Sequence, residues 1–337
     1  LPISSVPYLE AASMGIELGP NDMVYRCNLV NIGDMDTPDA FMDDFTAGHI
    51  SSTEAAEIIY DLNKELGKPP YEFFPGVGYR HLFVWRESPA APETTPPHDI
   101  TGKAIAGYLP RGNSFEEINS IMRRAADILK NHPINAKRNE AGKKQANSIW
   151  LWGQGRKPQI VPLTQKYSIT GGMVSAVDLL KGIGVIAGLK VCPVEGATGY
   201  IDTNYEGKAN MALDILNFMD FVFVHLEAPD EMGHEGNVEG KIKAIELFDE
   251  KIVGPILNRI GSFGDYRVIV LSDHPTPLDV RTHVSDPSPF AVLSSRKEEN
   301  MASGVSFNEI NARESKRIIS PGHLLMEKFI NDWRAVA

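Results

Sequence analysis

The stretch that decides the fold runs from Asp220 to His283. It opens with DFVFVHLEAPDEMGH at residues 220–234 and closes with RVIVLSDH at residues 267–274, followed by TH at 282–283. Its two apolar runs are short, rich in β-branched residues and ended by polar residues, which is typical of strands buried on both faces of a parallel sheet. Between them, residues 238–257 repeat apolar side chains at close to helical period. The sequence therefore predicts strand, helix and strand, with both strands central in an α/β sheet.

Polar residues that follow these two strands form a candidate metal site. Ligands of open α/β sheets bind beyond the carboxyl ends of the strands, where Asp230, His234, Asp273 and His274 are expected, and His283 follows a loop-length later. Carboxylate oxygen together with imidazole nitrogen suits zinc, manganese or iron better than calcium, which prefers oxygen alone. The Asp-x-x-x-His spacing by itself equally describes an acidic first helical turn. Five candidate ligands exceed the need of one ion and favour two, the usual device of phosphoryl transfer.

Three motifs in this region carry a resemblance to a known family. They are APDEMGHEG at 228–236, SDHPTP at 272–277 and RTH at 281–283. They resemble the metal motifs of the archaeal-type, cofactor-independent (2,3-bisphosphoglycerate-independent) phosphoglycerate mutases of the alkaline phosphatase superfamily. The resemblance implies an α/β fold with an alkaline phosphatase-like, doubly wound, mainly parallel sheet and an inserted smaller α+β cap domain. It also implies two divalent metal ions, manganese or zinc.

On the family pattern the two ions have separate ligands. The resemblance implies that Asp230, His234 and His283 hold one ion, and that Asp273 and His274 hold the other. It further implies a reaction that interconverts 3-phosphoglycerate and 2-phosphoglycerate through a phosphoserine intermediate. A homoserine kinase-like phosphotransferase of the same family is the main alternative, and a non-catalytic protein that binds metal and phosphometabolite is another.

The serine nucleophile is not identifiable in this sequence. In the resembled family an opening strand ends in a metal-binding Asp, and a nucleophilic Ser follows in a Gly-Ser-Asp-like turn. Ser4 and Ser5 lie near the right place but lack that context. We therefore expect the chain to lack roughly the first fifty to eighty residues of the family pattern, which would remove a central strand from the large domain.

The chain divides into two predicted domains. Residues 34–157 contain two helices, a few strands and a proline-rich loop, which indicates a smaller α+β domain inserted into a larger sheet domain. The resembled family carries such an insertion as its cap. Residues 1–33 and 158–337 are assigned to the metal-binding, alkaline phosphatase-like domain.

Local patterns predict the elements of both domains. Ser51 with Glu54, and Ser114 with Glu117, are capping-box patterns ahead of two helices. The remaining expected elements are strands at 23–32, 79–86, 185–191 and 289–293, and helices at 173–180, 209–218 and 320–333.

Basic residues beside glycines are the candidates for substrate binding. Arginine is the side chain best shaped to hold phosphate or carboxylate through two parallel bonds. The candidates are Arg26, His49, Arg80, His81 and Arg156. Surface or interdomain ion pairing explains each of them equally well.

The amino-acid composition limits the classes of molecule that this protein is expected to bind. The 337 residues are 42% apolar with a formal net charge of −11, which argues against nucleic acid and requires a local basic pocket for a small phosphorylated carboxylate substrate. Cys27 and Cys192 show no disulfide or zinc pattern and favour a reducing compartment. There is no apolar run of membrane-span length and no signal-like start, so we expect a cytoplasmic protein without a membrane partner. A homo-oligomer is left open.

Overall fold

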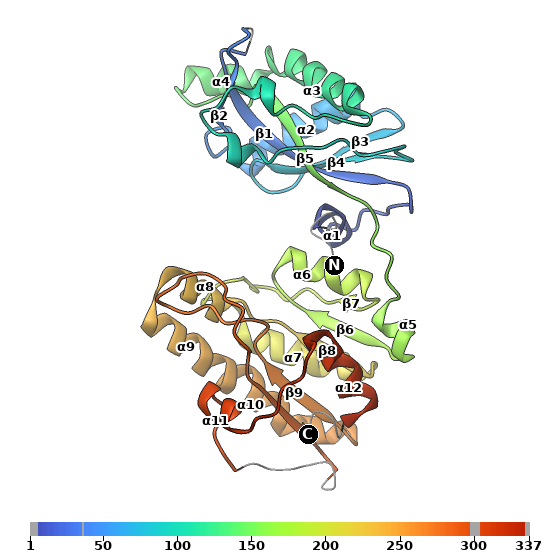
Figure 1. The fold of residues 1–337 in the computed structure, drawn as a ribbon, viewed down its shortest axis with the longest axis vertical. Coiled ribbons are helices and arrows are strands. Elements are labelled where there is room, and N and C mark those ends of the chain that lie inside the picture. Colours follow the sequence, from blue (N-terminus) through green and yellow to red (C-terminus); the bar gives the residue numbers. More distant parts are fainter. Residues whose placement is uncertain (1–5, 36, 297–303, 334–337) are drawn as a thin grey trace. The chain divides into compact units, whose positions relative to one another are not determined.

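The computed structural model describes residues 6–35, 37–296 and 304–333, so Ser4 and Ser5 lie outside the described residues. The chain forms two compact units, Leu1–Ile160 and Val161–Ala337 (Figure 1). The elements of the first unit are α1 (Val6–Ser13), β1 (Met23–Gly33), β2 (Phe41–Asp44), α2 (Ser52–Leu66), β3 (Tyr71–Phe74), β4 (Arg80–Trp85), η2 (Pro97–Ile100), η3 (Ile105–Gly107), α3 (Phe115–Leu129), α4 (Pro133–Glu140) and β5 (Ser148–Gly155).

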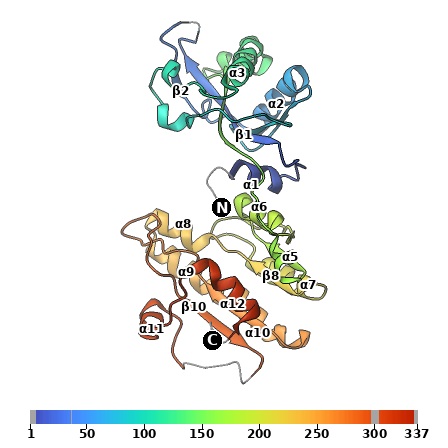
Figure 2. The same cartoon turned by 45° about the vertical axis from the view of Figure 1, so that its right-hand side comes forward.

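The first unit is built around β1, in the middle of a five-stranded antiparallel sheet. β1 pairs with β4 and β5 along its length and with β2 near its end, and β3 pairs with β4. Successive side chains of a strand point to opposite faces. Tyr25, Cys27 and Leu29 lie in the core that α2 and α3 share, whereas Val24 packs in a smaller cluster with Ala11 of α1. Helices therefore cover both faces of this sheet (Figure 2).

The position of β1 corrects one predicted domain boundary. The sequence prediction assigns residues 1–33 to the metal-binding domain, but β1 is hydrogen-bonded to strands from residues 34–157 and falls in the first unit. The apolar pattern of a strand shows that it is buried and does not show which partner strand buries it. The first unit therefore includes the segment that precedes residue 34.

The second unit contains helices and short strands. They are α5 (Leu163–Tyr167), β6 (Gly171–Val174), α6 (Asp178–Ile186), β7 (Lys190–Val191), α7 (Tyr205–Leu216), β8 (Phe221–Val224), α8 (Ala228–Glu235), α9 (Val238–Phe248), η4 (Asp249–Val253), α10 (Gly254–Ile260), η5 (Gly261–Phe263), β9 (Arg267–Leu271), β10 (Phe290–Ser294), α11 (Glu309–Glu314), η7 (Gly322–Leu324) and α12 (Leu325–Asn331). In the described residues β6 lies between β7 and β8 in a parallel sheet, and β9 pairs antiparallel with β10. The fold is mixed α/β.

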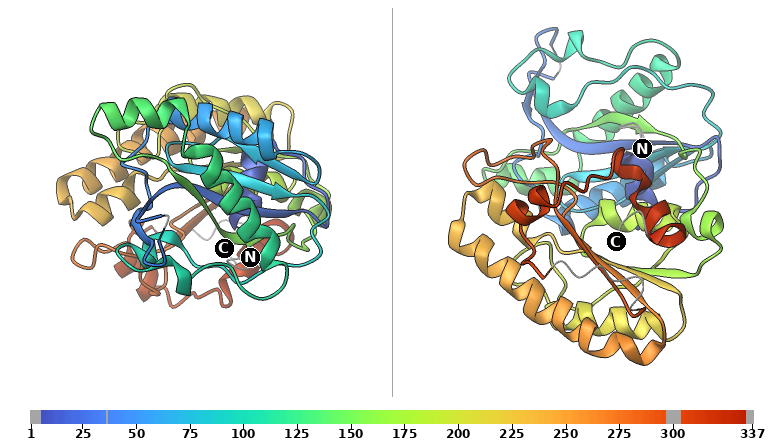
Figure 3. Two further views of the ribbon diagram at one scale, coloured as in Figure 1. Left: turned by 90° about the horizontal axis from the view of Figure 1, so that it is seen from above. Right: turned by 60° about the horizontal axis from the view of Figure 1, so that its bottom comes forward.

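The helix predicted between the two decisive strands is present. α9, η4 and α10 follow one another without a break and run as one long helical stretch (Figure 3). Its middle is a single π-helical segment. η4 and α10 pack on α7, and α7 in turn packs on β6 and β8.

The two decisive strands differ from the prediction in their partners. Within residues 6–35, 37–296 and 304–333, β8 pairs only with β6, and β9 pairs only with β10, so the two are not central strands of one parallel sheet. Their side chains are mostly half-buried, with Phe223 36% and Leu271 40% exposed. A short apolar run indicates a strand but carries no information on pairing.

The segment that starts at Gly171 corrects a second prediction. The sequence predicts a helix at 173–180, but β6 occupies Gly171–Val174 and α6 begins at Asp178. A Cβ added at Gly172 would lie 2.8 Å from the side chain of Ile215, so the glycine lets α7 approach the strand closely. Tertiary packing against α7 and pairing with β8 override the weak local helical pattern.

We predict that Leu62→Ala will destabilise the first unit by about 2–5 kcal/mol, because Leu62 of α2 is fully buried and its truncation leaves a cavity. Urea denaturation followed by tryptophan fluorescence measures this, since Trp85, Trp150 and Trp152 all lie in the first unit. Tyr60→Ala, on the exposed side of the same helix at 63% exposure, is the control and should change stability by less than about 1 kcal/mol. Equal losses in both variants would contradict the packing described here.

Candidate metal centre

Helix α8 carries the first two predicted ligands on one face. It begins after Glu227 with Pro229 in its first turn and ends at Gly236, which adopts a left-handed conformation with φ +68°. Asp230 lies in the first turn, where a carboxylate interacts favourably with the helix dipole. His234 follows four residues later, so its side chain lies one turn along on the same face.

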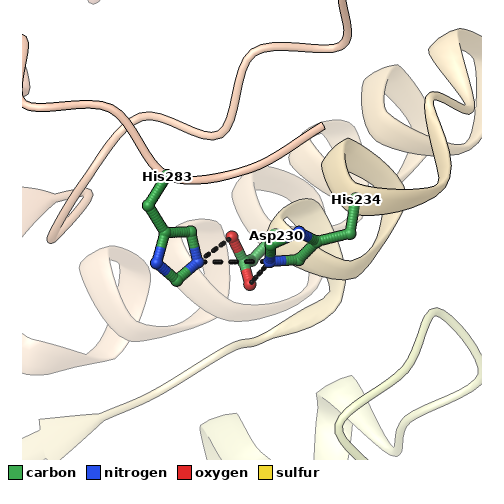
Figure 4. A group of neighbouring side chains, drawn as sticks. All are labelled: Asp230, His234 and His283. Carbon is green, nitrogen blue, oxygen red and sulfur yellow. Dashed lines mark hydrogen bonds and ion pairs between the residues drawn. The ribbon is translucent and has the colours of Figure 1, made fainter. Parts of the chain in front are cut away.

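Three side chains converge at this face of α8 (Figure 4). His234 Nε2 lies 3.1 Å from Asp230 Oδ2, and His283 Nε2 lies 3.4 Å from Asp230 Oδ1. The two Nε2 atoms are 3.1 Å apart. Because the ring nitrogen Nδ1 of His234 lies 3.0 Å from the carbonyl oxygen of Arg281, which can only accept, that Nδ1 carries the proton. In the neutral ring, Nε2 of His234 therefore keeps the lone pair that can bind a metal ion.

The donor set fits a divalent ion. Asp230, His234 and His283 each offer one ligand atom within 4.8 Å of the others. Two imidazole nitrogens with one carboxylate oxygen suit manganese, zinc or iron. Atoms that are each about 2.1 Å from one ion lie about 3 to 3.5 Å apart, which is the spacing found here.

Asp273 and His274 lie beside this triad. The ring of His274 stacks on that of His283 with centroids 3.7 Å apart and an interplanar angle of 33°. His274 Nε2 lies 3.4 Å from Asp273 Oδ2, and the Asp273 side chain is 74% exposed. The structure thus gathers all five predicted ligands in one place, with the tightest grouping at Asp230, His234 and His283.

The electrostatics of the triad favour an ionised carboxylate. Burial acts to raise the pKa of Asp230, but a hydrogen bond from Thr276 and the three neighbouring histidines outweigh it and hold the pKa below its ordinary value. The pKa of His234 is raised, first by its hydrogen bond to the Arg281 carbonyl and then by the negative charge of Asp230. Asp230 is therefore ionised at neutral pH, and its negative charge favours binding of a metal cation.

Thr276 is a site residue that the sequence reasoning missed. Only 4% of it is exposed, and its hydroxyl donates to Asp230 Oδ1 and lies 3.3 Å from Nδ1 of His274. The motif SDHPTP contains this residue, but a threonine carries no ligand signature. Its position two residues after a predicted ligand was the available signal.

Two substrate-binding candidates of the first unit have other roles in the structure. His81 is buried at 2% exposure, its Nδ1 accepts the Gly76 amide, and burial lowers its pKa to about 4. Arg26 makes a bidentate ion pair with Glu10 of α1 and lies over the Trp152 ring. His81 is therefore a core residue, which corrects its prediction as a substrate-binding residue. Arg26 forms an ion pair, which was the alternative to its prediction as a substrate-binding residue.

The other three candidates are more accessible. His49 is exposed in a left-handed turn with φ +49°, where its amide donates to Thr46. Arg80 is exposed at the start of β4 and lies 5.8 Å from the Tyr79 ring centre. Arg156 is half-buried and donates from Nη2 to the Ser88 carbonyl.

Comparison with known proteins assigns this chain to a family. A family model described as 2,3-bisphosphoglycerate-independent phosphoglycerate mutase matches residues 7–135. A Methanosarcina barkeri relative of that name is 48% identical over 308 residues, which cover 91% of this chain and 76% of the relative. A Geobacter sulfurreducens relative is 47% identical over 323 residues, covering 96% of this chain and 80% of the relative. The chain belongs to this family.

A solved structure is similar to this chain in fold. The cofactor-independent phosphoglycerate mutase of Thermoplasma acidophilum has a TM-score of 0.66 and 22% identity, with 96% of this chain and 80% of that chain covered. The two chains therefore share a fold. In the described residues of the present protein, no helix is both long and apolar enough to cross a membrane.

We predict that His81→Gln will reduce the acid sensitivity of this mutase. In the unfolded chain His81 is protonated as the pH falls below its ordinary pKa of 6.5. In the folded protein the buried His81 is protonated only near its lowered pKa of about 4. Stability from neutral His81 is therefore complete above pH 6.5 and is lost as the pH falls toward 4, by up to about 3 kcal/mol. Glutamine keeps an acceptor for the Gly76 amide.

Urea denaturation at pH 7 and pH 4.5 measures the effect. The difference in unfolding free energy between the two pH values should be smaller in the variant than in the parent. A difference of the same size in both proteins would contradict a buried neutral histidine at this position.

Proposed function

We propose that this protein is a metal-dependent phosphoglycerate mutase that interconverts 3-phosphoglycerate and 2-phosphoglycerate through a phosphoserine intermediate. The observation that carries the proposal is the triad of Asp230, His234 and His283, in a chain that is 47–48% identical to mutases over most of its length. The nucleophilic serine is not identifiable in this chain.

The proposed centre holds two divalent ions, manganese or zinc. Asp230, His234 and His283 would hold one ion, and Asp273 with His274 would hold the other. Bound ions supply Lewis acidity, which lowers the pKa of a serine hydroxyl and neutralises charge on the transferred phosphoryl oxygens. The protein's own contribution is orientation, because the Arg281 carbonyl and the Thr276 hydroxyl fix the His234 ring and the Asp230 carboxylate.

The proposed substrate contacts come from the first unit. Arg80, Arg156 and His49 remain accessible basic groups on a protein of net charge −11, and such groups attract a small phosphorylated carboxylate locally. Arg26 could join them only by exchanging Glu10 for a substrate anion. In this proposal residues 34–157 together with β1 act as the α+β cap, and the second unit provides the alkaline phosphatase-like, doubly wound sheet domain.

We predict that the full-length protein with manganese will convert 3-phosphoglycerate to 2-phosphoglycerate. The matched assay is ATP-dependent phosphorylation of homoserine under the same conditions. Activity in the first assay supports the mutase. Activity only in the second would keep the metal centre and replace the function, and silence in both with intact protein would reject catalysis.

We predict that His234→Ala and Asp273→Ala will each weaken manganese or zinc binding and transfer activity by more than about 100-fold, because each would remove a direct ligand. Equilibrium dialysis measures binding and the mutase assay measures transfer. His323→Ala, at an exposed position in η7, is the matched control and should change neither. Full activity in His234→Ala or Asp273→Ala would overturn the ligand assignment.

A further inference from the structure

Thr276 occupies a position between the two groups of proposed ligands. Its hydroxyl donates to Asp230 Oδ1, in the group proposed for one ion, and lies 3.3 Å from Nδ1 of His274, in the group proposed for the other. The residue is 4% exposed, so water does not compete freely for these bonds. Thr276 is the link between the two halves of the site.

The direction of these bonds follows from the donor and acceptor inventory. An ionised carboxylate can only accept, so the single O–H of Thr276 points to Asp230. Toward His274 the hydroxyl then has only lone pairs, and Nδ1 of the ring must be the donor. In the neutral ring a proton on Nδ1 leaves the Nε2 lone pair of His274 for a metal ion, and Nε2 lies 3.4 Å from Oδ2 of Asp273, its proposed co-ligand.

The backbone around Thr276 is held in place by α8 and α9. Lys241 of α9 donates from Nζ to the Thr276 carbonyl oxygen at 2.6 Å. A Cβ added at Gly233 of α8 would lie 2.6 Å from the same carbonyl oxygen and 2.9 Å from Lys241 Nζ. The glycine between the two ligands of α8 therefore creates the space in which the Thr276 loop and the lysine meet.

We propose that Thr276 is a positioning residue that orients the Asp230 carboxylate and selects the Nδ1-protonated form of His274, so that both proposed ligand groups are set together. This inference rests on the metal centre of the proposed function. The role belongs to the Thr276 hydroxyl and not to the packing of its methyl group. A pair of matched substitutions separates hydrogen bonding from packing.

Thr276→Val removes the hydroxyl and keeps the shape, whereas Thr276→Ser keeps the hydroxyl and removes a methyl group. We expect Thr276→Val to lose about 10- to 100-fold in affinity for manganese or zinc, as is usual when a bond to a metal ligand is removed. Thr276→Ser should stay within about threefold of the parent. Competition with a coloured chelator on the full-length protein measures both affinities without using activity.

The opposite order would overturn the inference. If Thr276→Val binds metal like the parent while Thr276→Ser is impaired, the residue acts by packing alone. If the parent binds no metal, the proposed metal centre itself fails, which is a distinguishable result. Circular dichroism of the metal-free proteins establishes that both variants are folded.

A second measurement covers the case in which Thr276→Val does not fold. Long-range proton–nitrogen spectra of the metal-free parent report the tautomer of each histidine ring above the pH at which it is charged. We expect His274 to be protonated at Nδ1 in the parent and in Thr276→Ser. A neutral His274 protonated at Nε2 in the parent would contradict the assigned direction of the Thr276 bonds.

Discussion

The close approach of α8 to the loop that follows β9 is the constraint on which the site depends. Gly233 in α8 and Gly236 after it leave the space for this approach. A Cβ at Gly233 would lie 2.6 Å from the Thr276 carbonyl oxygen, and one at Gly236 would lie 2.5 Å from Nε of Arg281. A side chain at either position would separate the helix from the loop. Asp230 and His234 would then lose their partners on the loop, since the group proposed for one ion combines these two residues of α8 with His283 of the loop.

The charges at the site follow from that packing. One half-buried carboxylate, Asp230, faces three imidazole rings, and the hydrogen bond from Thr276 helps to keep its pKa low. Protons and divalent ions compete for the same nitrogen atoms because both need the lone pair of the ring. An ion pair between Asp230 and protonated His234 is thus the proton-bound counterpart of the metal-bound site. The same geometry serves both states.

Local patterns in the sequence predicted what local physics decides. The capping box of Ser51 and Glu54 is formed ahead of α2, and the Asp-x-x-x-His spacing correctly predicted that Asp230 and His234 lie one helical turn apart on α8. Ser114 shows the limit of such patterns: its φ of +56° turns the side chain away from a capping bond, and Glu117 accepts instead from Tyr71. α3 forms nevertheless, because its apolar face packs into the core of the first unit.

Long-range pairing was the part that sequence could not supply. The alternation of β1 shows a buried strand, yet its hydrogen-bonding partners are β2, β4 and β5, up to about 130 residues away in the chain. The same limit applies to β9, whose partner β10 is antiparallel. In the site, Thr276 was missed because a hydroxyl becomes informative only when its two partners are known. Burial of His81 likewise depends on the pairing of β4 between β1 and β3 and on the helices that cover both faces of the sheet.

Preorganisation explains how the proposed ligands, which come from separate segments, can form one site. Bringing His283 to Asp230 closes a long loop, and a metal ion that had to supply that closure alone would bind weakly. Here protein bonds already hold the loop: Lys241 binds the Thr276 carbonyl, and His234 binds the Arg281 carbonyl. The entropy of ordering the loop is therefore lost during folding rather than during binding. The metal affinity of the proposed site then depends on the ligand atoms and on the hydrogen bonds that orient them.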